Sequence, residues 1–247
     1  MVRRSFERQV PLFSGPDSPF ARRPSGTLSW IEPLNDDMIV LDVACGAAHA
    51  AEPVAERVRQ VVGIDLTRAL LDVGAQRLRG NGVGNILLQE ANAESLPFLD
   101  ESFDVVFCRS SLHHFAAPSV AVSEMVRVSR VGGRVVLVDL VAPADDVRDR
   151  FDHVHRLIDP SHVRTFLEPE LADLLPGRID ELAYADTSTI RLPIDIALTD
   201  QSASAEVLDL LRAEARGAGR PTGFDPVEED GKLVVSFTSC IVHAVRA

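Results

Sequence analysis

The sequence predicts an α/β fold in which a doubly wound, mostly parallel sheet carries helices on both faces. Five short apolar runs alternate with segments of helical periodicity between residues 38 and 140, and only short turns separate them. Strands and helices that alternate in this way form right-handed βαβ units, which place their strands in one parallel sheet. A chain of 247 residues accommodates such a sheet in one large domain, or in one domain with a small additional lobe.

The first half of the chain supplies the elements of this sheet in order. Runs rich in Val, Ile and Leu suit strands that are buried on both faces. We expect these strands over residues 38–44, 61–65, 86–89, 103–108 and 134–140. We expect helices between them over residues 47–59, 67–79 and 120–128. Pro53 is expected to bend the first helix and Thr67 to cap the second, and residues 131–133 form a turn before the fifth strand.

Beyond residue 142 the pattern is less regular. Helices are expected over 145–158, 168–175 and 203–216, and extended segments over 182–192 and 232–245. Residues 1–36 are rich in Pro, Ser and Arg and show no sustained period, and a helix is compatible with the sequence only near residues 26–34. We interpret residues 1–36 as an N-terminal arm that packs onto the domain.

The composition argues against several classes of function. A formal net charge of −12 at pH 7 disfavours nucleic acids and anionic membranes as partners, since phosphate contacts need a basic surface. No apolar stretch approaches the ~18 residues of a membrane span, and no signal peptide is recognisable at the N-terminus. The cysteines Cys45, Cys108 and Cys240 show no paired spacing. We therefore expect a cytoplasmic protein with reduced thiols, present as a monomer or a homodimer.

The most informative segment lies where the first expected strand ends. The strand ends in Asp42-Val43 and is followed by the small residues Ala44, Cys45 and Gly46 before a helix begins. Small residues allow a ligand to approach the backbone closely, and a helix N-terminus at this place can receive a phosphate. Asp42 puts a carboxylate there instead, which repels a pyrophosphate and favours a cationic ligand.

Two further polar residues follow the next two strands. Asp65 ends the second strand, where its carboxylate can accept hydrogen bonds from both hydroxyls of a ribose. Asn92 follows the third strand and offers an amide to an adenine edge. Because the carboxyl ends of parallel strands meet at one edge of a sheet, Asp42, Asp65 and Asn92 are expected to line one crevice. The alternatives are a simple turn for Asn92 and plain loop acids for the other two.

Five segments of the chain share their order and spacing with a known family. They are VLDVACG (40–46), VVGIDLT (61–67), NAESLPF (92–98), DESFDVVFCRSSLHHF (100–115) and RVGGRVVLVDL (130–140). Together they resemble the class I S-adenosylmethionine (SAM)-dependent methyltransferases, within them the branch of the ubiquinone and menaquinone biosynthesis C-methyltransferases, where DPSHVR (159–164) also occurs. The resemblance covers about 38–165. It implies a Rossmann-like, seven-stranded sheet with an antiparallel C-terminal strand and inserted helices that form a lid.

The resemblance also implies cofactor contacts for individual residues. The loop of Ala44, Cys45 and Gly46 would lie against the methionine part of SAM, and Asp42 would hold its ammonium group. Asp65 would bind the ribose hydroxyls. The remaining implied contacts are Leu66, Asn92 and Ala93 with the adenine, and the backbone carbonyl of Arg109 near the methionine ammonium.

The chain departs from the usual family pattern at a few places. Ala44 and Ala48 stand where glycine is usual, and each added methyl is expected where cofactor and backbone nearly touch. Asn92 replaces a commoner Asp. The arm of relatives often presents a Tyr to the cofactor; here the candidate aromatic residues are Phe6, Phe13 and Phe20.

Histidines supply the candidate catalytic groups. By the resemblance, His113 and His114 would face the transferred methyl group or the acceptor, with a purely structural role as the alternative. A general base is needed only for an acceptor whose proton has a high pKa; His114 is the first candidate, and His113 and His162 follow.

A second group of polar residues, His153, His155, Asp159 and His162, suggests a metal site at first sight. Pro160 interrupts this segment, and the spacing matches no known metal motif. No metal is therefore expected, and we interpret the group as a solvated helix face or one polar wall of the acceptor pocket.

These observations divide the chain into an N-terminal arm or lid (1–36), a SAM-binding core (37–142), acceptor-pocket insertions with the last sheet elements (143–231) and a C-terminal strand (232–247). The predicted function is SAM-dependent methyl transfer to a small organic acceptor, with S-adenosylhomocysteine as the second product. One alternative is a SAM-binding protein that transfers no methyl group. The other is an NAD(P)-dependent oxidoreductase, which the absence of GxGxxG after the first strand disfavours.

Overall fold

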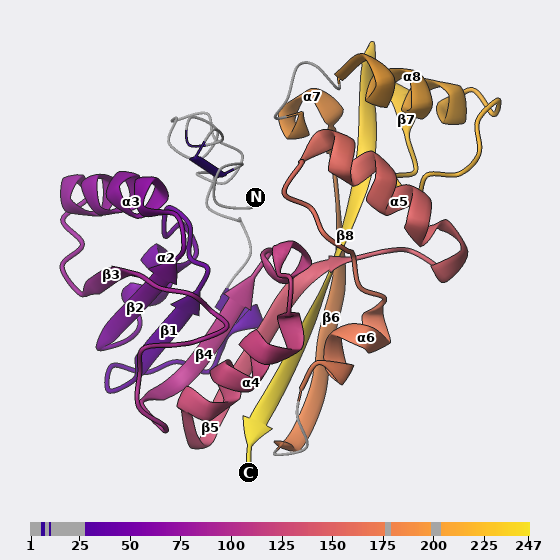
Figure 1. Ribbon diagram of the computed structural model, residues 1–247. Helices are drawn as coiled ribbons and strands as arrows, with labels where there is room; N and C mark the ends of the chain where they lie inside the picture. The colour runs from indigo at the N-terminus through magenta and orange to yellow at the C-terminus, as the bar shows by residue number, and fades with distance from the viewer. Residues whose placement is uncertain (1–5, 8–9, 11–27, 176–178, 199–203) are drawn as a thin grey trace.

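Figure 1 shows the computed structural model, which describes the chain except for residues 1–5, 8–9, 11–27, 176–178 and 199–203. One eight-stranded sheet runs through the described residues. Its strands are β1 (Ile39–Val43), β2 (Gln60–Asp65), β3 (Ile86–Glu90), β4 (Phe103–Arg109), β5 (Ser129–Val141), β6 (Ile179–Pro193), β7 (Val227–Glu229) and β8 (Lys232–Arg246).

The strand order confirms the predicted fold class. The sheet runs β3-β2-β1-β4-β5-β8-β6, and β7 pairs with β8 at one side. Strands β1 to β5 are parallel, whereas β8 is antiparallel to both β5 and β6. The seven strands of the main order match the expected number. The short β7, which the sequence analysis did not predict, adds an eighth.

The helices connect these strands at nearly the expected places. The helix over Asp145–Ile158 has the predicted bounds, and the other predicted helices except the first agree within two residues, whereas the short helix over Ile194–Ala197 was not predicted. None of the described helices has the length and apolar character needed to cross a membrane. The helices are α2 (Ala51–Ala55), α3 (Arg68–Gly80), α4 (Pro118–Val128), α5 (Asp145–Ile158), α6 (Glu168–Asp173), α7 (Ile194–Ala197) and α8 (Ser204–Ala215), with the 3-10 turns η1 (Leu28–Trp30) and η2 (Leu112–His114).

The helix expected over residues 47–59 is wrong in its extent, since only α2 is helical. Ala48 has a φ of 61°, which a right-handed helix does not allow, so the chain turns before α2 begins. Pro53 lies in the first turn of α2, where its missing N–H needs no helical partner, and it does not bend the helix. The turn expected over 131–133 lies inside β5 as a bulge, because Phe103 pairs with Ser129 but Val105 pairs with Arg134.

Two apolar clusters cover the two faces of the sheet. On one face, Leu41 of β1 packs with Met125 of α4 and Leu171 of α6. On the other face, the neighbouring Val40 packs with Val54 of α2, and Ile31 after η1 joins the same cluster. Consecutive residues of β1 therefore point to opposite faces, as the period of two in a strand requires.

A third apolar cluster forms the core of a separate lobe. It joins Phe151 of α5, Ile194 of α7, Leu211 of α8 and Phe237 of β8. In Figure 1 these helices and β7 gather around the ends of β6 and β8, beyond the carboxyl edge of the parallel strands. The residues expected to surround an acceptor therefore have their own packing on one side of that edge.

Gly74 allows α3 to approach the loop before α2 very closely. A Cβ atom at this position would lie 2.8 Å from the backbone oxygen of Ala47. Overpacking of this kind costs about 1–3 kcal/mol, and the better helix propensity of Ala returns part of it. We expect Gly74→Ala to lower the free energy of unfolding by about 1–2 kcal/mol, measured by urea denaturation.

Gly80 at the end of the same helix is the matched control. A Cβ atom at Gly80 would meet no atom within 4 Å. Gly80→Ala should therefore leave stability unchanged or raise it by up to ~1 kcal/mol. If both variants unfold at the same urea concentration, the close approach at Gly74 does not constrain the fold.

Candidate active site

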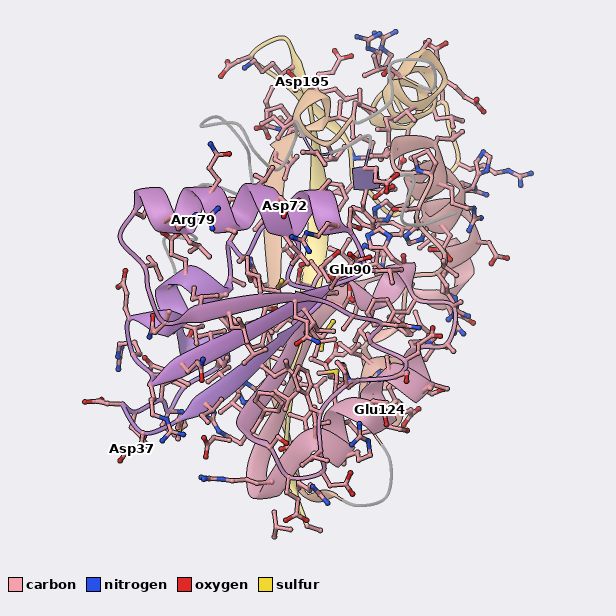
Figure 2. The ribbon with its side chains drawn as sticks, turned by 60° about the vertical axis from the view of Figure 1, so that its left-hand side comes forward. Asp37, Asp72, Arg79, Glu90, Glu124 and Asp195 are labelled. Carbon is pink, nitrogen blue, oxygen red and sulfur yellow. The ribbon has the colours of Figure 1, made fainter. Side chains whose placement is uncertain are left out.

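The loops that follow β1, β2 and β4 meet at the carboxyl edge of the parallel strands. Figure 2 shows Asp37, just before β1, at the opposite edge of the sheet, and Glu90, the last residue of β3, at this one. The backbone N–H of Cys45 donates to the carbonyl of Ile64 at 2.9 Å and joins the first two loops. Strand order reverses here between β1 and β4, which is where open α/β sheets bind ligands.

The loop after β1 has a left-handed backbone at three positions. Ala44, Gly46 and Ala48 have φ values of 58°, 54° and 61°, which cost a non-glycine residue roughly 1–2 kcal/mol. Glycine is usual at the first and last of these positions in the family that the sequence resembles, and the backbone conformation explains that preference. The methyl of Ala48 packs into the apolar cluster with Val54. It therefore does not crowd the crevice, contrary to the expectation for this residue.

Asp42 is a buried carboxylate that lacks a hydrogen-bond partner. Its side chain is 2% exposed, and its Oδ2 atom has no donor among the described residues. Burial raises the pKa of Asp42 well above its ordinary value, although the positive charge of Arg109 opposes the shift. A buried acceptor without a donor costs free energy, so the position suits a ligand that brings an N–H group or a positive charge.

Asp65 holds the first two loops in place. Its Oδ2 accepts a hydrogen bond from the backbone N–H of Gly46 at 2.9 Å, and its Oδ1 accepts one from Thr67 at 2.7 Å. Thr67 stands at the N-cap of α3, but its side chain makes no cap hydrogen bond, contrary to expectation. Because each carboxylate oxygen has two acceptor positions, Asp65 retains capacity for a ligand. Leu66 beside it is 43% exposed, which is unusual for a leucine at a buried strand end.

Asn92 forms a turn after β3. Its Oδ1 accepts a hydrogen bond from the backbone N–H of Glu94 at 3.0 Å, and its carbonyl accepts one from Ser95 at 3.1 Å. The turn role that the sequence left as the alternative is therefore present, and contact of the Asn92 amide with an adenine stays a prediction. The neighbouring Ala93 is buried against the sheet.

Arg109, the last residue of β4, lies against Trp30 of η1. The guanidinium carbon of Arg109 lies 5.9 Å from the centre of the Trp30 ring, within the range of a cation–π contact. The carbonyl of Arg109 accepts a hydrogen bond from the hydroxyl of Ser111 at 3.1 Å. Cys108, at the end of β4, is buried, and burial raises the pKa of its thiol well above the usual value. A buried thiol with a raised pKa is a poor nucleophile, so Cys108 is expected to be inert.

His113 is paired with a carboxylate that the sequence analysis did not single out. Its Nδ1 lies 2.5 Å from Oδ1 of Asp139, a fully buried residue of β5. Burial alone lowers the pKa of His113, but the charge and hydrogen bond of Asp139 outweigh it, so the pKa is raised. The sequence did contain a signal for this pair: Asp139 is an acid inside the apolar run VVLVDLV, and a buried charge requires a partner.

His114 is held in a neutral state. Burial and the charge of His113 lower the pKa of His114 to about 3. Its Nδ1 lies 3.1 Å from the hydroxyl of Ser161, and that hydroxyl donates to Asp159 at 2.6 Å. The other ring nitrogen of His114, Nε2, lies 3.9 Å from Oδ2 of the same Asp159. Phe6 of the N-terminal arm packs edge-on against this ring at 5.0 Å; Phe13 and Phe20 lie outside the described residues.

His155 and His162 lie inside the protein, not on a solvated face. His162 Nε2 contacts Oδ1 of Asp152 at 2.7 Å, and the two imidazole rings stack at 4.1 Å. Burial, opposed by Asp152, lowers the pKa of His162, and burial followed by the charge of His162 lowers that of His155 well below its usual value. Of the polar segment that the sequence suggested, only His153 is exposed. The buried position of His155 was not predicted, because the spacing of residues along one helix does not show which element packs against that helix.

Comparison with known proteins agrees with this geometry. The family model of the methyltransferase domain matches residues 41–137. A solved structure from Bacillus halodurans C-125, which carries a provisional methyltransferase name, is 30% identical and covers 86% of this chain and 94% of its own, with a TM-score of 0.74. The chain belongs to the SAM-dependent methyltransferase family. The resemblance seen in the sequence is therefore confirmed.

The chain is also similar to proteins of named or unknown activity. YcgJ of Bacillus subtilis, an uncharacterised methyltransferase, is 41% identical over 156 residues, which are 63% of this chain and 61% of YcgJ. Its crystal structure covers 98% of both chains with a TM-score of 0.77. The demethylmenaquinone methyltransferase of Geobacillus kaustophilus is 38% identical over 125 residues, 47% of this chain and 53% of that enzyme. In sequence, the chain thus spans roughly half to three fifths of the length of these two relatives.

Proposed function

We propose that this protein transfers a methyl group from SAM to a small organic acceptor in the cytoplasm and releases S-adenosylhomocysteine. The observation that carries the proposal is the unpartnered Oδ2 of Asp42, buried at the crevice between β1 and β4. An ammonium group supplies the missing donor, whereas a pyrophosphate adds charge of the same sign. Asp42 therefore favours the methionine part of SAM over a dinucleotide.

The remaining cofactor contacts follow from the same edge of the sheet. Asp65 keeps acceptor positions for ribose hydroxyls, and the exposed Leu66 offers an apolar surface to the adenine. The loop Ala44–Gly46 allows close approach of a ligand to its backbone. Asn92, Ala93 and the carbonyl of Arg109 complete the proposed contacts. When bound, SAM supplies a methyl group that its sulfonium already activates.

The protein then has to hold an acceptor close and in line, an effect that supplies ~7–11 kcal/mol when the geometry is right. Ser161 fixes the ring of His114, which is too weak a base to take up an acceptor proton but can hydrogen-bond to the acceptor. Its pKa of about 3 keeps the ring uncharged, so that it does not repel a cationic cofactor. We assign the acceptor-facing role to His114 first and keep His113 and His162 as further candidates.

The lobe over residues 143–231 and the N-terminal arm are the proposed walls of the acceptor pocket. The helices α5, α7 and α8 of this segment have their own apolar core and lie beyond the edge that carries the cofactor residues (Figure 1), whereas α6 and β6 belong to the main core and the main sheet. Insertions at this place usually set acceptor choice in α/β enzymes. Relatives named for quinone methylation support a small molecule as the acceptor class.

Calorimetry with S-adenosylhomocysteine and with NAD tests the cofactor assignment. We expect binding of S-adenosylhomocysteine at micromolar concentration and none of NAD at millimolar concentration. Isotope-labelled SAM, incubated with a panel of small phenols, quinols and amines, then tests transfer by mass spectrometry. NAD binding in place of S-adenosylhomocysteine would overturn the proposal; SAM binding without transfer to any acceptor would leave a SAM-binding protein.

A further inference from the structure

Three histidines from separate parts of the chain meet beside His114. They are His113 of η2, His155 of α5 and His162 of the loop after α5, and all three are buried. One ring nitrogen of each lies within 4.8 Å of those of the other two. We propose that these three imidazoles bind a divalent transition-metal ion.

Two of the three rings are oriented by buried carboxylates. His113 contacts Asp139 through Nδ1 at 2.5 Å, and His162 contacts Asp152 through Nε2 at 2.7 Å. A metal-binding histidine commonly donates its second N–H to a carboxylate, which fixes the tautomer and makes the ligating nitrogen more basic. Here the carboxylates engage one nitrogen of each ring and leave the other for an ion.

Two ring nitrogens of the cluster lack a partner. Nδ1 of His155 and Nδ1 of His162 have no hydrogen bond within the described part of the chain. Their residues are only 6% and 3% exposed. Buried polar atoms are nearly always paired, and a metal ion supplies what these two nitrogens lack. Its positive charge would also be balanced by Asp139 and Asp152.

The ligand set selects the class of ion. Imidazole suits Zn²⁺, Co²⁺, Ni²⁺, Cu²⁺ and Fe²⁺, whereas Mg²⁺ and Ca²⁺ prefer oxygen ligands. Zinc–nitrogen bonds of about 2.0–2.1 Å in a tetrahedral site place the nitrogens about 3.4 Å apart. The rings therefore have to close by up to about 1.4 Å, which side-chain rotation allows.

Three protein ligands leave the fourth position of a tetrahedral ion open. On the proposed function, that position takes an oxygen or nitrogen of the acceptor, next to His114, whose ring lies 4.0 Å from that of His113. His113 and His162 then serve as metal ligands, and the acceptor-facing role stays with His114. Ion binding itself does not depend on methyl transfer.

The sequence analysis expected no metal, because it considered the spacing along one segment. His153 belonged to that group but lies exposed on α5, whereas His113 comes from the loop after β4. Only the packing of α5 against that loop brings the three ligands together. The spacing of His155 and His162 alone matches no metal motif.

The test uses the full chain, freed of any histidine tag and stripped with a chelator. We expect it to bind one equivalent of Co²⁺ with the intense visible absorption of a tetrahedral site, and Zn²⁺ to displace the Co²⁺. His155→Leu should weaken Co²⁺ binding at least 100-fold. The matched control is His153→Leu, the same change on the same helix at an exposed position, which should bind as the wild type does.

Two further variants test the orienting carboxylates. Asp139→Asn and Asp152→Asn should each lower the affinity for Co²⁺ about 10- to 100-fold and still bind one equivalent. Circular dichroism checks that each variant folds, and the wild-type titration decides the question if one does not. The proposal is overturned if the wild type binds less than one equivalent, if its Co²⁺ spectrum is octahedral, or if folded His155→Leu binds like His153→Leu.

Calorimetry with S-adenosylhomocysteine on the same metal-free sample separates this proposal from the proposed function. Cofactor binding without Co²⁺ binding removes only the metal site. Co²⁺ binding without cofactor binding removes only the methyltransferase assignment.

Discussion

Asp42→Asn is expected to stabilise the free protein and at the same time to weaken its binding of S-adenosylhomocysteine. The carboxylate of Asp42 is buried with an unpartnered oxygen, so replacing the charge by an amide should raise the free energy of unfolding by about 1–2 kcal/mol. The same change removes the charged acceptor for the methionine ammonium. We expect about 10- to 100-fold weaker binding, the equivalent of about 1.5–3 kcal/mol.

The ligand itself provides the control for this prediction. 5′-Methylthioadenosine carries the same nucleoside but lacks the amino acid, so its affinity should be the same for Asp42→Asn and the wild type. Asp72→Asn on α3, at an exposed side chain, controls for the loss of one negative charge. An equal loss of affinity for both ligands would mean that Asp42 acts on the nucleoside or on the loop, and not on the ammonium.

The gain in stability should also depend on pH. The pKa of Asp42 is raised in the folded protein, with burial as the main cause. The penalty of burying the charge is therefore full above the folded pKa and vanishes below the unfolded value of ~3.9. Urea denaturation should show the two proteins converging as the pH falls toward that value. A constant difference across this range would show that charge burial is not the cause.

The strands of the parallel sheet were predictable from the sequence, because the local pattern and the packing agree. Runs such as residues 61–65 are apolar on both faces, and that pattern fits a buried parallel strand. The first helix was overestimated for a local reason as well: nothing in the composition of residues 47–50 shows that Ala48 takes a left-handed φ. Only contact with the rest of the fold imposes that conformation.

Part of the candidate site was predictable for a topological reason. Asp42 and Asp65 stand at the ends of neighbouring parallel strands, so their positions along the chain were enough to place them near one another. The partners of the histidines were not predictable in this way. Asp152 contacts His162 because the loop after α5 folds back onto that helix. Asp139 and Ser161 contact His113 and His114 through the packing of β5 and of the loop after α5 against η2. No periodic pattern encodes contacts between elements so far apart in sequence.

Asp65→Ala should weaken the binding of S-adenosylhomocysteine about 10- to 100-fold, because it removes charged hydrogen bonds worth about 1.5–3 kcal/mol. Asp65 has two functions that one variant does not separate. It is proposed to bind the ribose. It also fixes the loops after β1 and β2, because it accepts hydrogen bonds from the backbone N–H groups of Gly46 and Thr67. A pair of ligands that differ only in the ribose distinguishes them.

Adenosine and 2′,3′-dideoxyadenosine form that pair. If Asp65 accepts hydrogen bonds from the ribose, the wild type should prefer adenosine at least 10-fold, and Asp65→Ala should bind the two nucleosides equally. If Asp65 acts only by fixing the two loops, Asp65→Ala should lose affinity for both nucleosides and still prefer adenosine. Asp65→Asn retains one carbonyl acceptor for the loop and should lie between the wild type and Asp65→Ala. The preference for the ribose hydroxyls, more than the affinity, therefore decides the role of Asp65, since loosening the loop weakens both ligands alike.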